Sequence, residues 1–215
     1  KPDAKTDTAK PKAETITLTL EYAGVTMPLH FEAGTAVLLS SYDGQVLRGC
    51  WQSLTQEKSR CTLQIGEKTL PFRGLADLRR HRIAVWDGTA EPPALQENLT
   101  LQENILLPSM PRISRCGFFE IAAKKVFSDR EFWRSRLPAE TEPDSVKTAR
   151  VLADRWLFFH PRVLFIYNVF SSSDYTVRRI LQQFVQDLCA RGTTVVLLET
   201  ADHSCRSFVN AEISL

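Results

Sequence analysis

Residues 40–49 are the stretch of the chain whose residue types are most similar to those of a phosphate-binding loop. They read Ser-Ser-Tyr-Asp-Gly-Gln-Val-Leu-Arg-Gly and directly follow an apolar run of strand length. A phosphate-binding loop needs glycines, so that backbone N–H groups can reach the phosphates, together with a lysine and a Ser or Thr for Mg²⁺. Here Ser41, Gly44 and the cation Arg48 have suitable types, but the stretch contains no lysine. Tyr42 and Asp43 add bulk and negative charge where a phosphate would lie.

The sequence gives little support for a metal site, a disulfide framework or nucleic-acid binding. The five cysteines are scattered along the 215 residues, with no C-x-x-C or Cys/His cluster, and their odd count argues against a disulfide framework. We therefore predict no metal site, no cofactor and a reducing cytosol. The net charge of +2 gives no electrostatic case for nucleic acid. No apolar run reaches the ~18 residues of a membrane-spanning helix.

The elements that must position any site are clearest between residues 149 and 200. Apolar residues at helical spacing cover 149–159 and stop before Pro161, and Val163–Tyr167 is a continuous apolar run typical of a buried parallel strand. A second helix follows, capped by Ser173 or Asp174, with Gly192 at its C-terminal end. Residues 193–198 form another β-branched run. The order predicts a right-handed βαβ unit and hence a parallel sheet.

The N-terminal half predicts shorter elements. Residues 1–14 are polar and aperiodic, which is typical of a flexible tail. Strands are expected at 15–22, 27–31, 35–39 and 83–86, and a hairpin over 61–70 that turns at Gly66-Glu67. The hairpin sequence Gly-Glu-Lys-Thr resembles a phosphate-loop Gly-Lys-Thr with an insertion, and we interpret it as a solvated turn. Thr100 and Glu103 form a capping box, and residues 118–127 and 132–136 are expected to be helical.

These stretches together resemble an ABC-transporter ATPase subunit. Arg150–Leu157 is similar to the helix after the family's signature motif, His160–Phe165 to the approach to the Walker B strand, and Ser171–Asp174 to the D-loop. Residues 98–108 are similar to a family motif that follows the Q-loop. The resemblance covers about residues 15–215. It implies an α/β, P-loop NTPase-like ABC ATPase fold with a mainly parallel core sheet, an antiparallel β-subdomain and a small helical subdomain at about 109–148. It also places Tyr22 where the family stacks an aromatic ring on adenine.

The chain departs from the family where the chemistry is expected. Leu47 takes the place of the phosphate-loop lysine and Arg48 that of the Mg²⁺-binding hydroxyl, while Tyr167-Asn168 replaces the Asp-Glu pair of Walker B. The other departures are Asp87 at the Q-loop position, 143–147 at the signature and Ala201 at the switch histidine. Two alternatives stay open: Arg48 as a displaced phosphate ligand, and a shifted register that uses His203. The losses predict a pseudo-ATPase that has kept the scaffold without catalytic residues or nucleotide.

The retained motifs predict partners. In the family, the D-loop that ends at Asp174 touches the opposite subunit, and the region that contains Asn104, Phe118 and Phe119 docks on the membrane permease. We therefore expect an integral membrane permease as partner, two copies of this chain or an ABC ATPase-like subunit in a dimer, and a cytoplasmic, peripheral location on the inner face of the membrane. The motif at 98–108 favours the lipid-transport branch. The competing functions are a divergent active ATPase and a soluble interaction module.

Overall fold

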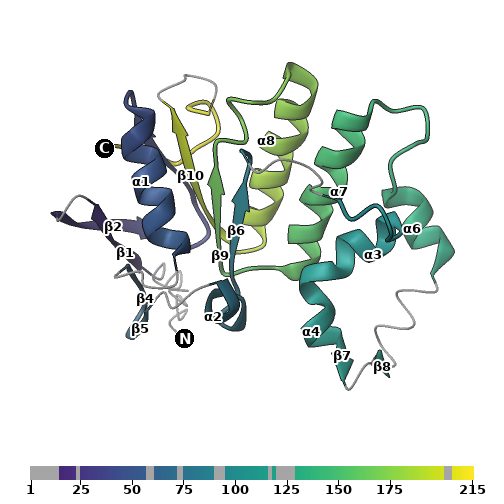
Figure 1. Ribbon diagram of the computed structural model, residues 1–215, viewed down its shortest axis with the longest axis horizontal. Helices are drawn as coiled ribbons and strands as arrows, with labels where there is room; N and C mark the ends of the chain where they lie inside the picture. Colours follow the sequence, from purple (N-terminus) through teal and green to yellow (C-terminus); the bar gives the residue numbers. More distant parts are fainter. Residues whose placement is uncertain are drawn as a thin grey trace, which may run out of the picture.

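The computed structural model describes residues 15–22, 25–56, 61–71, 75–89, 95–115, 118–119, 129–200 and 205–215. The flexible tail predicted at residues 1–14 lies outside this part of the chain, as do Ala201 and His203. Within it, the elements form two large sheets with helices around them, and a separate helical region with a two-stranded hairpin lies at one end of the molecule (Figure 1).

A five-stranded parallel sheet is the centre of the fold. Its spatial order is β11-β3-β10-β9-β6. The bounds of these strands are β3 (Ala36–Ser41), β6 (Ile83–Asp87), β9 (Val163–Tyr167), β10 (Thr194–Thr200) and β11 (Ala211–Ser214). Because all five run in the same direction, their carboxyl ends meet at one edge, which is where α/β folds place ligands.

A four-stranded antiparallel sheet lies beside it, in the order β2-β1-β4-β5. Its strands are β1 (Thr15–Tyr22), β2 (Val25–Glu32), β4 (Thr62–Ile65) and β5 (Lys68–Pro71). Strands β4 and β5 form the predicted hairpin, in which Gly66 adopts a φ of 59° at the turn. The structure therefore places Gly66-Glu67 in a hairpin turn and Lys68-Thr69 in the strand after it, as expected, and not in a phosphate loop.

Helices cover both faces of the parallel sheet. Helix α1 (Gly44–Thr55) and the short α2 (Leu75–Arg80) lie on the side of the antiparallel sheet, and α7 (Asp144–Phe159) and α8 (Tyr175–Ala190) on the other (Figure 1). Alternate residues of the strands point into two separate cores. Phe165 and Leu39 pack toward α1 and β1, and Leu164 and Leu38 toward α7 and α8. This two-sided burial explains the continuous apolar runs in the sequence.

The helical region beyond α7 is built from short pieces. They are α3 (Leu101–Leu106), a 3₁₀ turn η1 (Leu107–Ser109), α4 (Met110–Ile113) and α6 (Arg130–Arg136). Val151 of α7, Ile105 of α3 and Trp133 of α6 form its core. The capping box of Thr100 and Glu103 is confirmed at the start of α3.

Two predictions about this region were wrong. Residues 118–127 were expected to be helical from Phe118 on, but Ser114–Arg115 (β7) and Phe118–Phe119 (β8) pair as a small antiparallel hairpin. Cross-strand pairing satisfies the backbone hydrogen-bonding groups there. The spacing of the aromatic residues alone did not distinguish a helix from a hairpin. Helix α7 also begins at Asp144 and not at 149, because Pro143 and the acidic Asp144 are favourable at a helix start.

The buried cysteines give a prediction about reactivity. Cys50 is fully buried in α1, and burial, followed by the neighbouring Cys61, raises the pKa of its thiol to about 11. Only about one thiol in a thousand is then ionised at pH 8, and the thiolate is the reactive species. We expect Cys50 to resist a thiol reagent at pH 8 until urea unfolds the chain, as measured by mass spectrometry of labelled peptides. Val25→Cys, at an exposed strand position, is the reactive control; equal labelling of both would contradict the prediction.

Candidate functional site

The connection between β3 and α1 occupies the place expected for a phosphate loop, and it is very short. β3 ends at Ser41 and α1 begins at Gly44, so that Tyr42 and Asp43 alone connect them. The Asp43 carboxylate accepts a 2.8 Å hydrogen bond from Gln45 N and caps the helix. A negative side chain therefore already occupies the helix N-terminus, which is where a phosphate would be stabilised.

The two residues expected to mark the lysine and hydroxyl positions point into different environments. Leu47 is buried in the core between α1 and the sheets, with 1% of its surface exposed. Arg48, the next residue, is exposed and lines a cavity of about 500 Å³ with Trp51, Asp87 and Tyr167. The structure thus brings Arg48 near the Walker B position but leaves Leu47 as a packing residue.

An aromatic pair fills the end of β9. The rings of Trp51 and Tyr167 stack with centroids 5.2 Å apart and an interplanar angle of 13°. Trp51 Nε1 donates to Asp87 Oδ2 at 2.9 Å, and the Thr89 backbone N–H and hydroxyl donate to Asp87 Oδ1 at 2.8 and 2.7 Å. Burial, and then the Asp87 carboxylate, raise the pKa of the Tyr167 hydroxyl, which keeps it neutral. The Asp87 carboxylate, which also lines this cavity, is thereby held by internal donors.

The turn after β9 brings two backbone segments into close contact. Asn168 has a φ of 50°, and its N–H donates to Leu198 O at 2.9 Å. Gly88 N donates to Tyr167 O at 2.8 Å, and a Cβ at position 88 would lie 2.6 Å from Asn168 O. Asn168 is thus a turn residue against the β6 end. Its amide has no basic group, which removes it as a general base.

Glu199 is the site residue that the sequence reasoning missed. It is 1% exposed, and its carboxylate accepts from the backbone N–H groups of Val169, Phe170 and Ser171 at 2.7, 2.9 and 3.2 Å and from the Ser171 hydroxyl. Burial raises the pKa of its carboxyl, and these four donors act in the opposite direction. Glu199 therefore holds the 169–171 segment against β10. A lone acid inside an apolar strand run was the signal that could have identified it.

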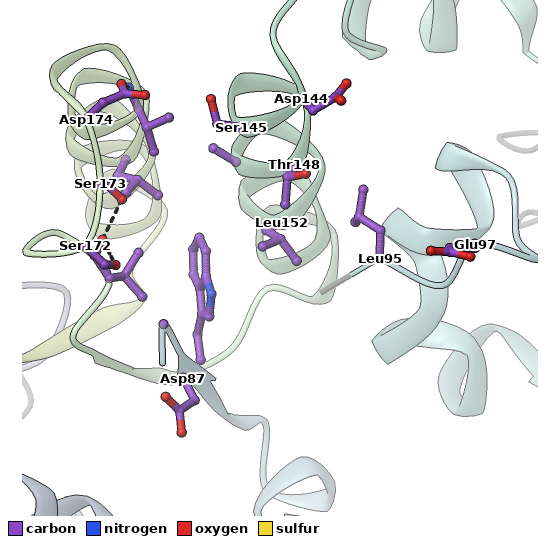
Figure 2. Close-up of a pocket in the computed structure, with 16 residues that line it drawn as sticks. Asp87, Leu95, Glu97, Asp144, Ser145, Thr148, Leu152, Ser172, Ser173 and Asp174 are labelled. Carbon is purple, nitrogen blue, oxygen red and sulfur yellow. Dashed lines mark hydrogen bonds between the residues drawn. The ribbon is translucent and has the colours of Figure 1, made fainter. Parts of the chain in front are cut away.

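The segment matched to the signature motif forms the start of α7. Asp144 and Ser145 are exposed at that helix end, and Asp174 caps the neighbouring helix α8 by accepting from Val177 N at 2.9 Å. Between the two helices lies a cavity of about 580 Å³, which we call the α7–α8 cavity (Figure 2). Its walls are mainly apolar. They include Trp86, Leu95, Ala149, Leu152, Val169, Val177 and Leu181.

The interface residues expected in the helical region divide into two groups. Asn104 is 1% exposed, and its side chain bonds to Gln96 and to the carbonyls of Leu99 and Thr100, while Arg155 donates to its carbonyl. Its polar atoms are therefore used inside the fold, and its role at an interface stays a prediction. The structure describes the backbone of Phe118 and Phe119 but not their side chains. Their docking role stays a prediction, as does the interface role of Asp174. The side chain of Tyr22 lies outside the described residues.

No group of three or more His, Cys, Asp or Glu residues that could hold a metal occurs in the part of the chain that the structure describes. Nor is any helix there long and apolar enough to cross a membrane.

The elements together define an α/β protein with a parallel core sheet, a supplementary antiparallel sheet and a helical region. No protein-family model matches the sequence, and no curated protein is significantly similar to it. Solved structures, however, are similar over almost the whole chain. The ADP conformation of MJ1267, an ATP-binding cassette of an ABC transporter, superimposes with a TM-score of 0.70 at 16% identity, over 95% of this chain and 88% of that one.

Two further structures give the same result. A nucleotide-free ATP-binding cassette from an ABC transporter has a TM-score of 0.66 at 16% identity, covering 94% of this chain and 87% of that one. The protein cbiO1 from Clostridium perfringens, part of the ABC transporter complex cbiONQ, has a TM-score of 0.68 at 10% identity, with 94% and 85% covered. The expected fold is thus confirmed: the chain has the fold of an ABC transporter ATP-binding cassette.

Proposed function

We propose that this chain is a non-catalytic, ABC ATPase-like subunit with a structural or regulatory role in a transporter-type membrane complex. The observation that carries the proposal is the connection between β3 and α1. A two-residue link offers no glycine-rich cradle, and the Asp43 carboxylate holds the helix N-terminus that a phosphate would need. The cassette fold is retained around a site that lacks the groups for phosphoryl transfer.

The other end of the site supports the same conclusion. Tyr167 is stacked on Trp51, and Asp87, which is the carboxylate among the described residues that line this cavity, accepts from Trp51 and Thr89. It is therefore already bonded inside the chain and does not replace the missing Walker B pair. Mg²⁺ is bound through hard oxygen ligands in such sites, and a neutral phenol and an amide side chain supply poor ones. The alternative of a divergent active ATPase depends on Arg48, which lines the same cavity.

Permease docking is the second part of the proposal. It is supported by the fold and by the printed description of cbiO1 as part of a transporter complex. On this view the chain lies in the cytoplasm against the inner face of the membrane, with a second copy or an ABC ATPase-like subunit beside it, and lipid transport is the first substrate class to examine. A soluble interaction module is the remaining alternative.

ATP turnover by the purified chain and its co-purification with membrane proteins test the proposal. We expect no turnover above that of a heat-inactivated sample, and ATP affinity weaker than low micromolar by fluorescent analogue titration, because positioned charges and metal ions supply most of the rate in such sites. Turnover that is lost in Arg48→Ala would establish the active-ATPase alternative. Full co-purification with a permease that persists in Phe118→Asp/Phe119→Asp would contradict the docking assignment, and the absence of any membrane partner would favour the soluble module.

A further inference from the structure

We infer that the α7–α8 cavity binds a small amphipathic amine whose apolar body carries an oxygen atom that accepts a hydrogen bond. The inference goes beyond the proposed function and does not depend on it. The volume of the cavity, about 580 Å³, is within the range of sites that enclose small organic molecules, about 300–1,000 Å³. Its lining comes from the end of β6, the approach to α3, the turn after β9, and helices α7 and α8 (Figure 2). One bound molecule can therefore contact both the core sheet and the segment that leads into the helical region.

An unused hydrogen-bond donor lines the cavity. The Trp86 side chain is 9% exposed and belongs to the cavity wall, where its ring packs against Phe184 with 5.9 Å between ring centroids. Its indole N–H makes no hydrogen bond within the part of the chain that the structure describes. Because a buried donor without an acceptor costs free energy, an oxygen atom of a bound molecule would satisfy it. A pure hydrocarbon would not, so the ligand needs an ether, carbonyl or hydroxyl oxygen in its apolar part.

The walls around this donor are apolar. Leu152, Val169 and Val177 are each less than 10% exposed and line the cavity together with Leu181, which is 1% exposed. An aromatic or aliphatic body gains from burial against such side chains through the hydrophobic effect. The walls therefore favour a ligand with an apolar body over a strongly hydrated molecule such as a sugar.

Negative charge at the mouth of the cavity favours a cation. Asp144 and Asp174 lie at the adjacent starts of α7 and α8 (Figure 2). Among the described residues, the lining contains these two carboxylates, Glu97 and the internally bonded carboxylate at the end of β6, and it contains no Lys, Arg or His. Lys147 lies 3.5 Å from Asp144, and Arg178 donates to two backbone carbonyls beside the cavity, so carboxylates remain in excess after both cations are counted. An ammonium group at the mouth is therefore attracted, and a phosphate or carboxylate is repelled.

Calorimetric titration with two probes of opposite charge tests the ligand class. Propranolol joins a naphthyl ether to a secondary ammonium group, and naphthoxyacetate joins the same naphthyl ether to a carboxylate. We expect one molecule of propranolol to bind per chain, and naphthoxyacetate to bind at least about ten-fold more weakly, because the carboxylates at the mouth attract the first probe and repel the second. No binding of propranolol, or equal affinity for the two probes, would overturn the inference.

Substitutions in the lining locate the bound probe. Thr148 is half-buried one turn before Leu152 on α7, and both line the cavity, so Thr148→Trp fills the space. It should weaken propranolol binding by more than about ten-fold, whereas Thr26→Trp, at an exposed position of β2, is the matched control and should leave the affinity unchanged. Trp86→Phe removes the donor but keeps an aromatic ring and should weaken binding by about two- to ten-fold. Circular dichroism confirms that the variants fold, and wild-type affinity in the folded Thr148→Trp chain would refute the site.

Removal of charge gives an independent measurement that leaves the walls of the cavity intact. Asp144→Asn/Asp174→Asn should raise the dissociation constant of propranolol by about five-fold, since two exposed carboxylates each contribute modestly. Asp43→Asn/Asp129→Asn is the matched control, because it neutralises two carboxylates at the starts of α1 and α6, outside the cavity, and asparagine still caps a helix. An equal loss of affinity in both double variants would show that net charge alone attracts the probe and would contradict the site. None of these results affects the tests of ATP turnover or permease docking.

Discussion

Gly88→Ala is expected to destabilise the fold by roughly 3 kcal/mol, because the added methyl group meets backbone that cannot move away independently. A Cβ at this position would lie 2.6 Å from Asn168 O and 2.7 Å from Val169 Cα. The same glycine is fixed by its 2.8 Å hydrogen bond to Tyr167 O. Urea unfolding monitored by circular dichroism measures the loss of free energy of unfolding.

Gly44→Ala is the matched control. It makes the same chemical change at the first residue of α1, where no heavy atom lies within 4 Å of the new Cβ. It should be neutral or stabilise the protein by about 0.4–1 kcal/mol, since alanine restricts the unfolded chain. Equal stabilities for the two variants would show that β6 and the turn after β9 are not packed as closely as described.

The second large effect is expected at Glu199. Glu199→Ala should lower the free energy of unfolding by roughly 3–5 kcal/mol, since three backbone N–H groups and a hydroxyl lose a buried acceptor. Glu199→Gln keeps one carbonyl oxygen and should lose less, about 1–3 kcal/mol. Glu67→Gln, in the exposed hairpin turn, is the control and should stay within about 0.5 kcal/mol of the wild type. An alanine variant as stable as the wild type would mean that Glu199 does not hold the 169–171 segment.

The pH dependence of this effect has a definite sign. Burial raises the pKa of the Glu199 carboxyl above its value in the unfolded chain, so the folded state binds the proton more tightly. The contribution of Glu199 to the free energy of unfolding therefore increases as the pH falls through the folded-state pKa toward the unfolded one, and decreases again as the pH rises. Comparing wild type with Glu199→Gln across this range isolates the group. A difference that moves in the opposite direction would show that the hydrogen bonds outweigh burial.

Local sequence patterns determined most of the elements. The apolar runs at Val163–Tyr167 and 193–198, the alternation at 15–22 and the capping residues Thr100 and Asp174 each act through neighbours in the chain, and each appears in the structure as expected. The resemblance to ABC ATPases, carried by short motifs, also predicted the correct fold. Spacing was ambiguous at Phe118–Phe119, where two residues pair in a hairpin and an aromatic pattern cannot choose between helix and strand.

The use of the site residues depends on contacts between elements far apart in the sequence. The stacking of Trp51 on Tyr167 and the four donors around Glu199 join residues 28 to 116 positions apart, and no local pattern encodes such contacts. The burial of Asn104 and the internal use of its polar atoms likewise depend on how α3 packs against α7. The length of the link after β3 was decided by where α1 begins, at Gly44 under the Asp43 cap. The sequence thus determined which elements form, whereas packing between distant elements determined which side chains remain available for chemistry or for a partner.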